Sequence, residues 1–262
     1  MPELFVIVLF ILGIFVGSFL NVLADRLPNG ENPFKGRSHC EYCKKILSPF
    51  DLIPLFSYIS TGGKCRYCKK KLSFYYPLSE LITGILFASA YIFSTNIGEF
   101  NIHFWLTIAY SLVILSSLIV IFLTDIKYGL IPFNVTVMAF VVALIFKSIY
   151  FSSDLRLSFI SALCSFLAFL FIFLVTKGRG MGFGDVIYVF LMGFLLGYPK
   201  IILGMYIAFI SGAIISLILV MAKKKKIKGS TIPFGPFLVS GTIISMFWGD
   251  ILISKITGYL LI

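Results

Sequence analysis

Four of the five cysteines form two short pairs whose spacing is typical of a metal site. Each pair encloses two residues, and 21 residues separate the pairs. Two such CxxC turns can present four thiolates to one tetrahedral zinc ion. Structural disulfides and a redox pair are the alternatives, but a reducing compartment disfavours disulfides and a redox site normally needs one CxxC only. We therefore predict a structural zinc ion bound by Cys40, Cys43, Cys65 and Cys68.

Two aspartates stand next to apolar segments, where they could perform acid–base chemistry. Asp125 ends one apolar run, and Asp185 follows a stretch of alternating glycines. Two adjacent carboxylates do not both ionise cheaply, so one can take a proton from water while the other protonates a scissile carbonyl. The glycines would let the backbone approach a substrate strand closely; they are Gly180, Gly182 and Gly184. The structural alternative is that Asp125 only ends a helix and Asp185 only caps one.

The apolar side chains define the elements that must position these residues. Of the 262 residues, 59% are hydrophobic and 13% charged, whereas a soluble domain has about a quarter charged. The apolar runs match the ~20 residues that cross a bilayer, which excludes a soluble enzyme, a secreted disulfide scaffold and a disordered tail. We predict an all-α polytopic membrane protein with about eight transmembrane helices, the sixth of them short for a full crossing. The expected spans are 4–23, 77–94, 104–123, 131–149, 157–175, 184–198, 201–221 and 233–249.

The basic residues predict how the chain is oriented. With the N-terminus outside, 18 of the 22 Lys and Arg residues fall in segments that face the cytoplasm, as the positive-inside rule requires. These segments are 24–76, 124–130, 176–183 and 222–232. We interpret the cluster Lys223–Lys226 with Lys228 as a stop-transfer signal that contacts anionic lipid, and we expect no nucleic-acid partner. The predicted location is the cytoplasmic membrane.

This topology divides the chain into a first transmembrane helix (1–23), a cytoplasmic zinc-binding segment (24–76) and a transmembrane domain (77–262). The zinc segment is too short to be held together comfortably by apolar burial alone, and no internal repeat is identified. An even number of crossings separates Asp125 from Asp185, so both reach the same membrane face. Glu80 at the start of the second span could join the zinc-binding segment to the transmembrane domain by pairing with Arg26. The alternative is a carboxylate at a helix start that is simply stabilised by the helix dipole.

Seven motifs in order along nearly the whole chain resemble those of the type IV prepilin leader peptidases, membrane aspartyl proteases of the GxGD type. The motifs are Gly17-Ser-Phe-Leu-Asn-Val22 with Arg26-Leu-Pro28, the two CxxC pairs with Gly62-Gly-Lys-Cys65, Asp51-Leu-Ile-Pro54, Tyr76-Pro-Leu-Ser-Glu80, the segment at Asp125, Gly182-Phe-Gly-Asp185, and Pro233-Phe-Gly-Pro236.

The resemblance implies cleavage of prepilin or pseudopilin leader peptides after a glycine at the cytoplasmic membrane face, in type IV pilus assembly and protein secretion. Asp125 and Asp185 would be catalytic. The resemblance also implies N-methylation of the new N-terminus with S-adenosylmethionine, for which the zinc segment would be needed. The candidate residues of the substrate or cofactor region are Gly182, Gly184, Glu80 and Arg26.

Two alternatives stay open. A transporter or channel with a zinc-stabilised cap would place charged groups near mid-membrane and pair its broken helices by a repeat, whereas the acids here gather at one edge. A peptidase without methylation is the second alternative, because related enzymes lack the cysteine-bearing segment. The four cysteines argue against it, through the resemblance.

Overall fold

The structure is a computed structural model that describes residues 2–95, 101–222 and 232–260. These residues form helices and loops without a named strand, and seven helices are long and apolar enough to cross a membrane. An eighth, α7 (Phe183–Leu196), has 14 residues. The prediction of an all-α protein with about eight spans, the sixth of them short, is confirmed. The basic cluster at 223–228 lies outside the described residues.

The chain forms two compact units, residues 1–120 and 121–262, and the boundary between them falls inside α4 (Ile102–Tyr128). α4 extends five residues past the end of the predicted span, so Asp125 lies in the last helical turns rather than beyond the helix. The predicted division into a first helix, a zinc segment and a transmembrane domain is based on function, whereas these two units are defined by their compactness. That division stays a prediction.

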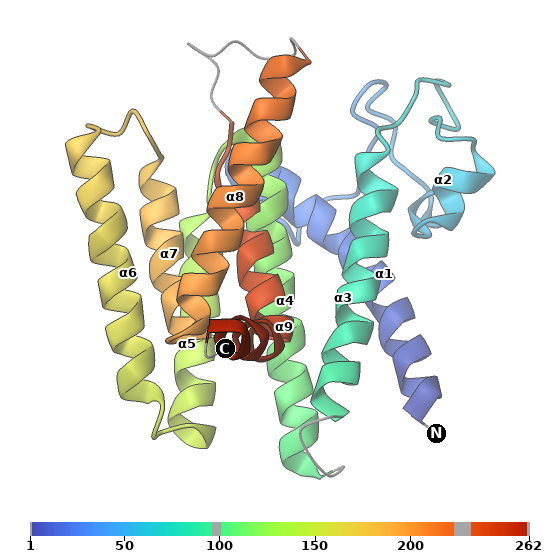
Figure 1. Cartoon of the computed structure of the whole chain (residues 1–262). Helices are drawn as coiled ribbons and strands as arrows, with labels where there is room; N and C mark the ends of the chain where they lie inside the picture. The colour runs from blue at the N-terminus through green and yellow to red at the C-terminus, as the bar shows by residue number, and fades with distance from the viewer. Residues whose placement is uncertain (1, 96–100, 223–231, 261–262) are drawn as a thin grey trace. The chain divides into compact units, whose positions relative to one another are not determined.

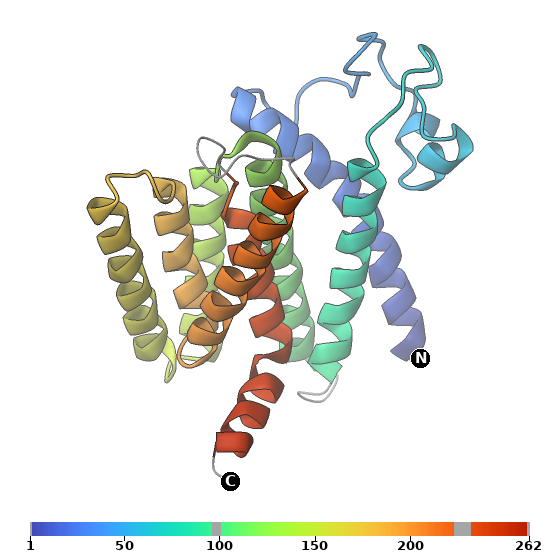
Figure 2. The ribbon, with the colours of Figure 1, turned by 45° about the horizontal axis from the view of Figure 1, so that its top comes forward.

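In the first unit, α1 (Pro2–Arg26) and α3 (Tyr75–Thr95) pack side by side (Figures 1 and 2). Small residues explain this close approach: a Cβ atom on Gly13 would lie 2.7 Å from the Gly84 Cα, and one on Gly17 would lie 2.9 Å from the Glu80 Cα. Without a hydrophobic driving force between membrane helices, such backbone proximity provides the van der Waals contact that holds them together. Between these helices run three short elements: η1 (Leu27–Asn29), η2 (Pro49–Leu52) and α2 (Phe56–Ser60).

The second unit is built around α7, which contacts four other helices of the unit: α5 (Phe133–Tyr150), α6 (Leu155–Val175), α8 (Lys200–Met221) and α9 (Gly235–Leu260). Figure 1 shows α7 next to α6. A Cβ atom on Gly193 of α7 would lie 2.7 Å from the Ala162 Cα of α6, so these two helices also meet through small residues. Because α7 is surrounded, it is apolar on nearly every side, as a buried helix must be.

The last helix is longer than predicted. The expected span ended at residue 249, but α9 continues to Leu260 because apolar residues follow Asp250. Asp250 is 83% exposed and forms an ion pair of 2.7 Å with Lys200. A charge this exposed does not interrupt the helix.

Candidate active site and metal centre

The four cysteines predicted to bind zinc come together in the first unit. Their sulfur atoms lie within 4.8 Å of one another, and the Sγ atoms of Cys40 and Cys68 are 4.0 Å apart. Thiolates about 2.3 Å from a tetrahedral zinc ion lie roughly 3.8 Å from each other, so the cluster has the size of a four-thiolate site. None of these cysteines forms a disulfide. The cluster therefore fits a metal ion, as predicted.

The local backbone prepares these sulfurs for a metal. In the first turn, the Cys40 N–H donates to the Lys45 carbonyl at 3.0 Å, and the Cys65 N–H donates equivalently to Lys70 at 2.9 Å. The Cys68 N–H is directed at the sulfur of Cys65 and lowers the pKa of that thiol to about 7, although burial opposes the change. A lowered pKa favours the Cys65 thiolate, which is the form that binds metal. The Lys70 N–H acts in the same direction on Cys68, but desolvation and the neighbouring cysteine sulfurs outweigh it and raise the pKa of Cys68 to about 11.

The two turns are copies of one another. Residues 39–48 and 64–73 are identical at seven of ten positions, and the two stretches share the same turn hydrogen bonds. Side chains cross between the copies, since the Lys45 ammonium lies 4.4 Å from the Tyr67 ring and the Lys70 ammonium lies 4.8 Å from the Tyr42 ring. The prediction that the chain has no internal repeat is therefore wrong. The signal was present in the sequence, in the matching residues around each CxxC.

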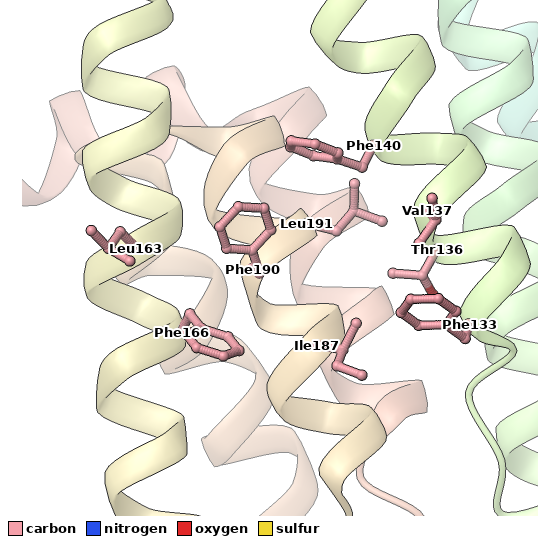
Figure 3. Close-up of a pocket in the computed structure, with 9 residues that line it drawn as sticks. All are labelled: Phe133, Thr136, Val137, Phe140, Leu163, Phe166, Ile187, Phe190 and Leu191. Carbon is pink, nitrogen blue, oxygen red and sulfur yellow. The ribbon is translucent and has the colours of Figure 1, made fainter.

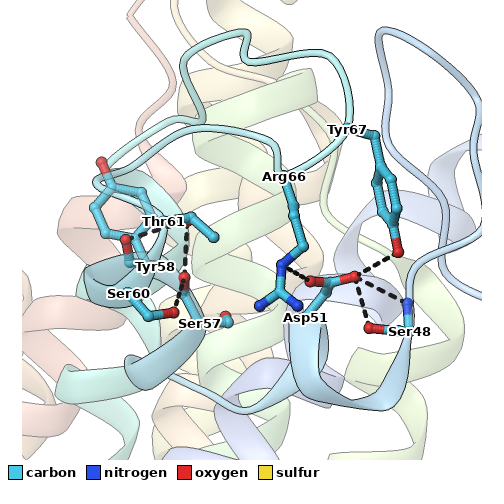
Figure 4. Close-up of polar contacts among 8 residues, drawn as sticks. All are labelled: Ser48, Asp51, Ser57, Tyr58, Ser60, Thr61, Arg66 and Tyr67. Atoms are coloured by element: carbon cyan, nitrogen blue, oxygen red, sulfur yellow. Dashed lines mark hydrogen bonds and ion pairs between the residues drawn. The ribbon is translucent and has the colours of Figure 1, made fainter.

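Asp51 holds the second turn from the side (Figure 4). Its Oδ2 accepts hydrogen bonds from the Ser48 backbone N–H at 3.0 Å, the Ser48 hydroxyl at 2.8 Å and the Tyr67 hydroxyl at 3.0 Å. Its Oδ1 lies 3.0 Å from the Arg66 Nε. Desolvation opposes ionisation, but the Ser48 and Tyr67 hydrogen bonds and the Arg66 charge outweigh it and hold the pKa of Asp51 below its usual value. Arg66 and Tyr67 are the two residues enclosed by the second pair of cysteines, so Asp51 fixes the turn through them.

Glu80 joins α3 to the zinc segment, but not through Arg26. Its Oε2 accepts a hydrogen bond of 2.8 Å from the backbone N–H of Leu55, whose φ of 58° is unusual for a residue other than glycine. Arg26 instead donates to the carbonyl groups of the loop that follows α1, including Lys35 at 2.8 Å. The predicted pairing of Glu80 with Arg26 is wrong, because Glu80 is bonded by the Leu55 N–H and the Ser18 side chain, and Arg26 by loop carbonyl groups.

Asp125 and Asp185 meet in the second unit. Asp125 lies in the last turns of α4 and Asp185 in the first turn of α7, and both are buried, at 5% and 6% exposed. They are close enough for their charges to interact. The two carboxylates are therefore neighbours in the second unit, whatever their chemical role.

The two glycines nearest to Asp185 differ in how closely other atoms surround them. The Gly182 N–H donates to the Asp185 Oδ2 at 3.0 Å and fixes that carboxylate. A Cβ atom on Gly184 would lie 3.1 Å from the Cβ of Ile131, in the loop after α4, so this glycine brings the two aspartate segments close together. A Cβ atom on Gly182 would make only an ordinary contact of 3.6 Å with the Asp185 Oδ2. Packing is therefore tight at Gly184 and not at Gly182.

Gly235 opens α9 against the other carboxylate. A Cβ atom there would lie 2.5 Å from the Oδ2 of Asp125. That oxygen is buried and forms no hydrogen bond of normal geometry with another described residue, although the Gly235 N–H lies nearby. In the sequence, the motif that contains Gly235 served only as one of the motifs shared with the peptidase family. The contact between Gly235 and Asp125 could not be predicted from it.

Two further contacts hold α7 in place. One turn after Asp185, the buried Tyr188 hydroxyl forms a hydrogen bond of 2.8 Å with Thr242 of α9. At the other end of α7, the Lys147 Nζ donates to the Phe194 carbonyl at 2.6 Å and to the Ser158 hydroxyl at 2.8 Å. The last carbonyl groups of a helix lack partners within it. Lys147 supplies one, and the position of the helix that carries Asp185 is thereby fixed at both ends.

Comparisons with known proteins agree with the motifs. Residues 11–94 match the family model described as the bacterial peptidase A24 N-terminal domain, and residues 112–217 match the type IV leader peptidase family. A prepilin leader peptidase/N-methyltransferase of Bacillus subtilis (strain 168) is 31% identical, covering 94% of this chain and 96% of the relative. Proteins with the same name from Stutzerimonas stutzeri and Pseudomonas aeruginosa are 28% and 29% identical; each comparison covers 95% of this chain and 92% of the relative. No solved structure matches.

Proposed function

The chain belongs to the type IV leader peptidase family, and on this premise we propose that it cleaves the leader peptide from type IV prepilin-like proteins, with Asp125 and Asp185 as its catalytic pair. One observation carries the proposal: two buried carboxylates from distant parts of the sequence lie close enough for their charges to interact. Buried acids in membrane proteins are expensive and are retained where function needs them.

The chemistry follows from the positions of the two carboxylates. Such a pair favours a state with one proton between its members. The charged carboxylate takes a proton from water, the water oxygen attacks the scissile carbonyl, and the protonated partner donates its proton to the carbonyl oxygen. Collapse of the tetrahedral intermediate breaks the C–N bond as the leaving amine takes the proton that the first carboxylate removed from water. A hydroxyl of the intermediate returns a proton to the second carboxylate, so the pair again holds one proton.

The membrane face of the reaction is part of the proposal. A prepilin joins a basic leader in the cytoplasm to an apolar helix in the bilayer, so its scissile bond lies at the membrane boundary. Both aspartates lie at helix ends beside segments that carry basic residues, such as Lys127 and Arg179. The positive-inside rule places those segments, and with them the dyad and the zinc segment, on the cytoplasmic side of a multi-pass membrane protein with its N-terminus outside.

We further propose that the chain N-methylates the new N-terminus. The amine nitrogen would take the methyl group from the sulfonium of S-adenosylmethionine, leaving a thioether and releasing a proton. The zinc ion would have a structural role, because four thiolates fill a tetrahedral site and leave no open position. The ion would be held by Cys40, Cys43, Cys65 and Cys68. Asp51 would hold the second CxxC turn in place, and Glu80 would attach the folded segment to α3.

The test combines both activities in one assay. The purified chain in detergent or vesicles is incubated with a prepilin and S-adenosylmethionine labelled in the methyl group, and cleavage and labelling are scored separately. We expect both, and about one zinc per chain by metal analysis. Cleavage without labelling would show a peptidase that does not methylate. If neither cleavage nor labelling occurs, the proposed function is wrong.

A further inference from the structure

The zinc segment exposes apolar side chains in its two short helical elements. Phe50 and Leu52 of η2 and Phe56 and Ile59 of α2 are all exposed, and we call these four residues the apolar strip. Phe56 and Ile59 are three residues apart and therefore share one face of α2. Single exposed apolar residues are ordinary, but four within ten positions suggest a surface that contacts something other than water.

A hydrogen bond sets the level of the strip relative to the membrane. Leu55 directly precedes α2, and its N–H donates to Glu80 of α3 at 2.8 Å. Glu80 lies five residues after the start of α3, which is about 8 Å along the helix axis. An interfacial element lies about 5–10 Å deep at the boundary of headgroups and acyl chains. Since α3 is long and apolar enough to cross the membrane, α2 begins at this depth, and Figure 1 shows it beside the upper end of α3.

The side chains of α3 at this level already face lipid. Leu78, Leu81 and Ile82 flank the buried Glu80 in the sequence and are exposed. Exposed apolar side chains of a membrane-spanning helix contact the bilayer, because a helix that is apolar on its outer face is solvated by lipid. The apolar strip therefore lies at the same level as a surface that contacts lipid.

Basic side chains accompany the strip. Asp51, within η2, pairs with Arg66 at 3.0 Å. It also accepts a hydrogen bond from Tyr67, and the Tyr67 ring lies 4.4 Å from the Lys45 Nζ. The whole segment 24–76 contains ten Lys and Arg residues against four Asp and Glu residues. Apolar residues beside a basic cluster are typical of surfaces that bind anionic lipid.

We propose that η2 and α2 dock the zinc segment on the anionic surface of the bilayer, with the apolar strip at the boundary of headgroups and acyl chains and with Arg66 and Lys45 among the phosphates. Charge and depth select this occupant. A basic prepilin leader and the basic zinc segment of a second copy would both be repelled. A soluble partner would have to displace lipid at this depth.

The apolar groove of the second unit, between α5 and α6, lacks these features (Figure 3). None of its nine lining residues is charged, and neither Asp125 nor Asp185 is among them. The strip differs because a hydrogen bond fixes its level and basic side chains define the charge of its partner.

The test measures contact with lipid directly in the full chain. Ile59→Trp is reconstituted into vesicles of phosphatidylglycerol and phosphatidylcholine, with and without bromine atoms near the top of the acyl chains, and the fluorescence of the unaltered chain is subtracted. We expect bromine to quench the added indole roughly twofold, because position 59 would lie at the acyl boundary. The matched control is Ile46→Trp, which alters an isoleucine of the first CxxC turn that is 52% exposed and outside the strip. It should show no quenching.

Lipid charge and zinc content complete the test. Vesicles of phosphatidylcholine alone, or high salt, should reduce the quenching of Ile59→Trp, because attraction of the basic side chains is lost or screened. About one zinc per chain shows that a variant keeps its folded segment, and Phe56→Trp replaces Ile59→Trp if zinc is lost. An unquenched variant that keeps its zinc, equal quenching at positions 59 and 46, or equal quenching in both lipid mixtures would overturn the proposal. None of these measurements requires catalysis, so a chain that fails to cleave prepilin would contradict the proposed function alone.

Discussion

The carboxylate of Asp125 packs directly against the α carbon of Gly235, about 110 residues later in the chain. A Cβ atom at position 235 would be 2.5 Å from the Oδ2 and 2.9 Å from the Cγ of Asp125. These distances are shorter than real Cβ contacts, so any other residue would push the carboxylate away or displace the start of α9. The position of one proposed catalytic oxygen therefore depends on a missing side chain in another helix.

Gly235→Ala tests this dependence. The added methyl group should displace Asp125, and because small misplacements of catalytic groups are costly, cleavage should fall by about a hundredfold. The measurement is the initial rate of prepilin cleavage at equal amounts of inserted protein. The control is Gly258→Ala in the same helix, where a Cβ atom would meet nothing within 4 Å. Unchanged cleavage by the Gly235 variant would mean that Asp125 need not occupy its present position.

Asp125→Asn and Asp185→Asn should each abolish cleavage, because an amide can neither take a proton from water nor share one with its partner. Both variants keep the shape of the side chain, so membrane insertion should be normal. Asp250→Asn is the control: it removes an 83% exposed carboxylate whose ion pair with Lys200 adds little stability. The assignment fails if either dyad variant processes prepilin at a near-normal rate.

The double variant Cys65→Ser, Cys68→Ser should lose zinc and reduce methylation more than cleavage. Folding of a small metal-bound segment is coupled to its metal, whereas the dyad belongs to a separate compact unit. The measurement is bound zinc together with both activities in the same membranes. Cys164→Ser, which alters an exposed cysteine of α6, should change none of the three. An equal loss of both activities would show that the zinc segment also shapes the protease site.

Lys147→Met should destabilise the second unit by about 1–3 kcal/mol, since the carbonyl of Phe194 and the hydroxyl of Ser158 would lose their buried donor. The midpoint of thermal unfolding in detergent measures this change. The control is Lys255→Met in α9, which removes an exposed lysine. An unchanged midpoint for the Lys147 variant would indicate that water or another group satisfies the end of α7.

The helices and the chemistry available to the candidate residues follow from local features of the sequence. Apolar runs of about twenty residues have one stable outcome in a bilayer, because every backbone polar group must be satisfied within the segment. The CxxC spacing likewise determines which sulfurs can share a metal, since two residues between cysteines form a single turn. Counting the spans between Asp125 and Asp185 predicts that both side chains lie at one membrane face. These inferences need only the local sequence and its periodicity.

Which groups touch depends on how the chain folds. The contact of Gly235 with Asp125, the bracing of the second CxxC turn by Asp51 and the partner of Glu80 all join residues that are well separated in the sequence. Glu80 shows why the sequence could not supply them: a nearby arginine looked like its natural partner, but the fold brought the Leu55 N–H to it and gave Arg26 three carbonyl groups. Charge and spacing limit the possible partners, and only the packing of helices and loops selects among them, because hydrogen bonds require contact distances that a pattern along the chain does not contain.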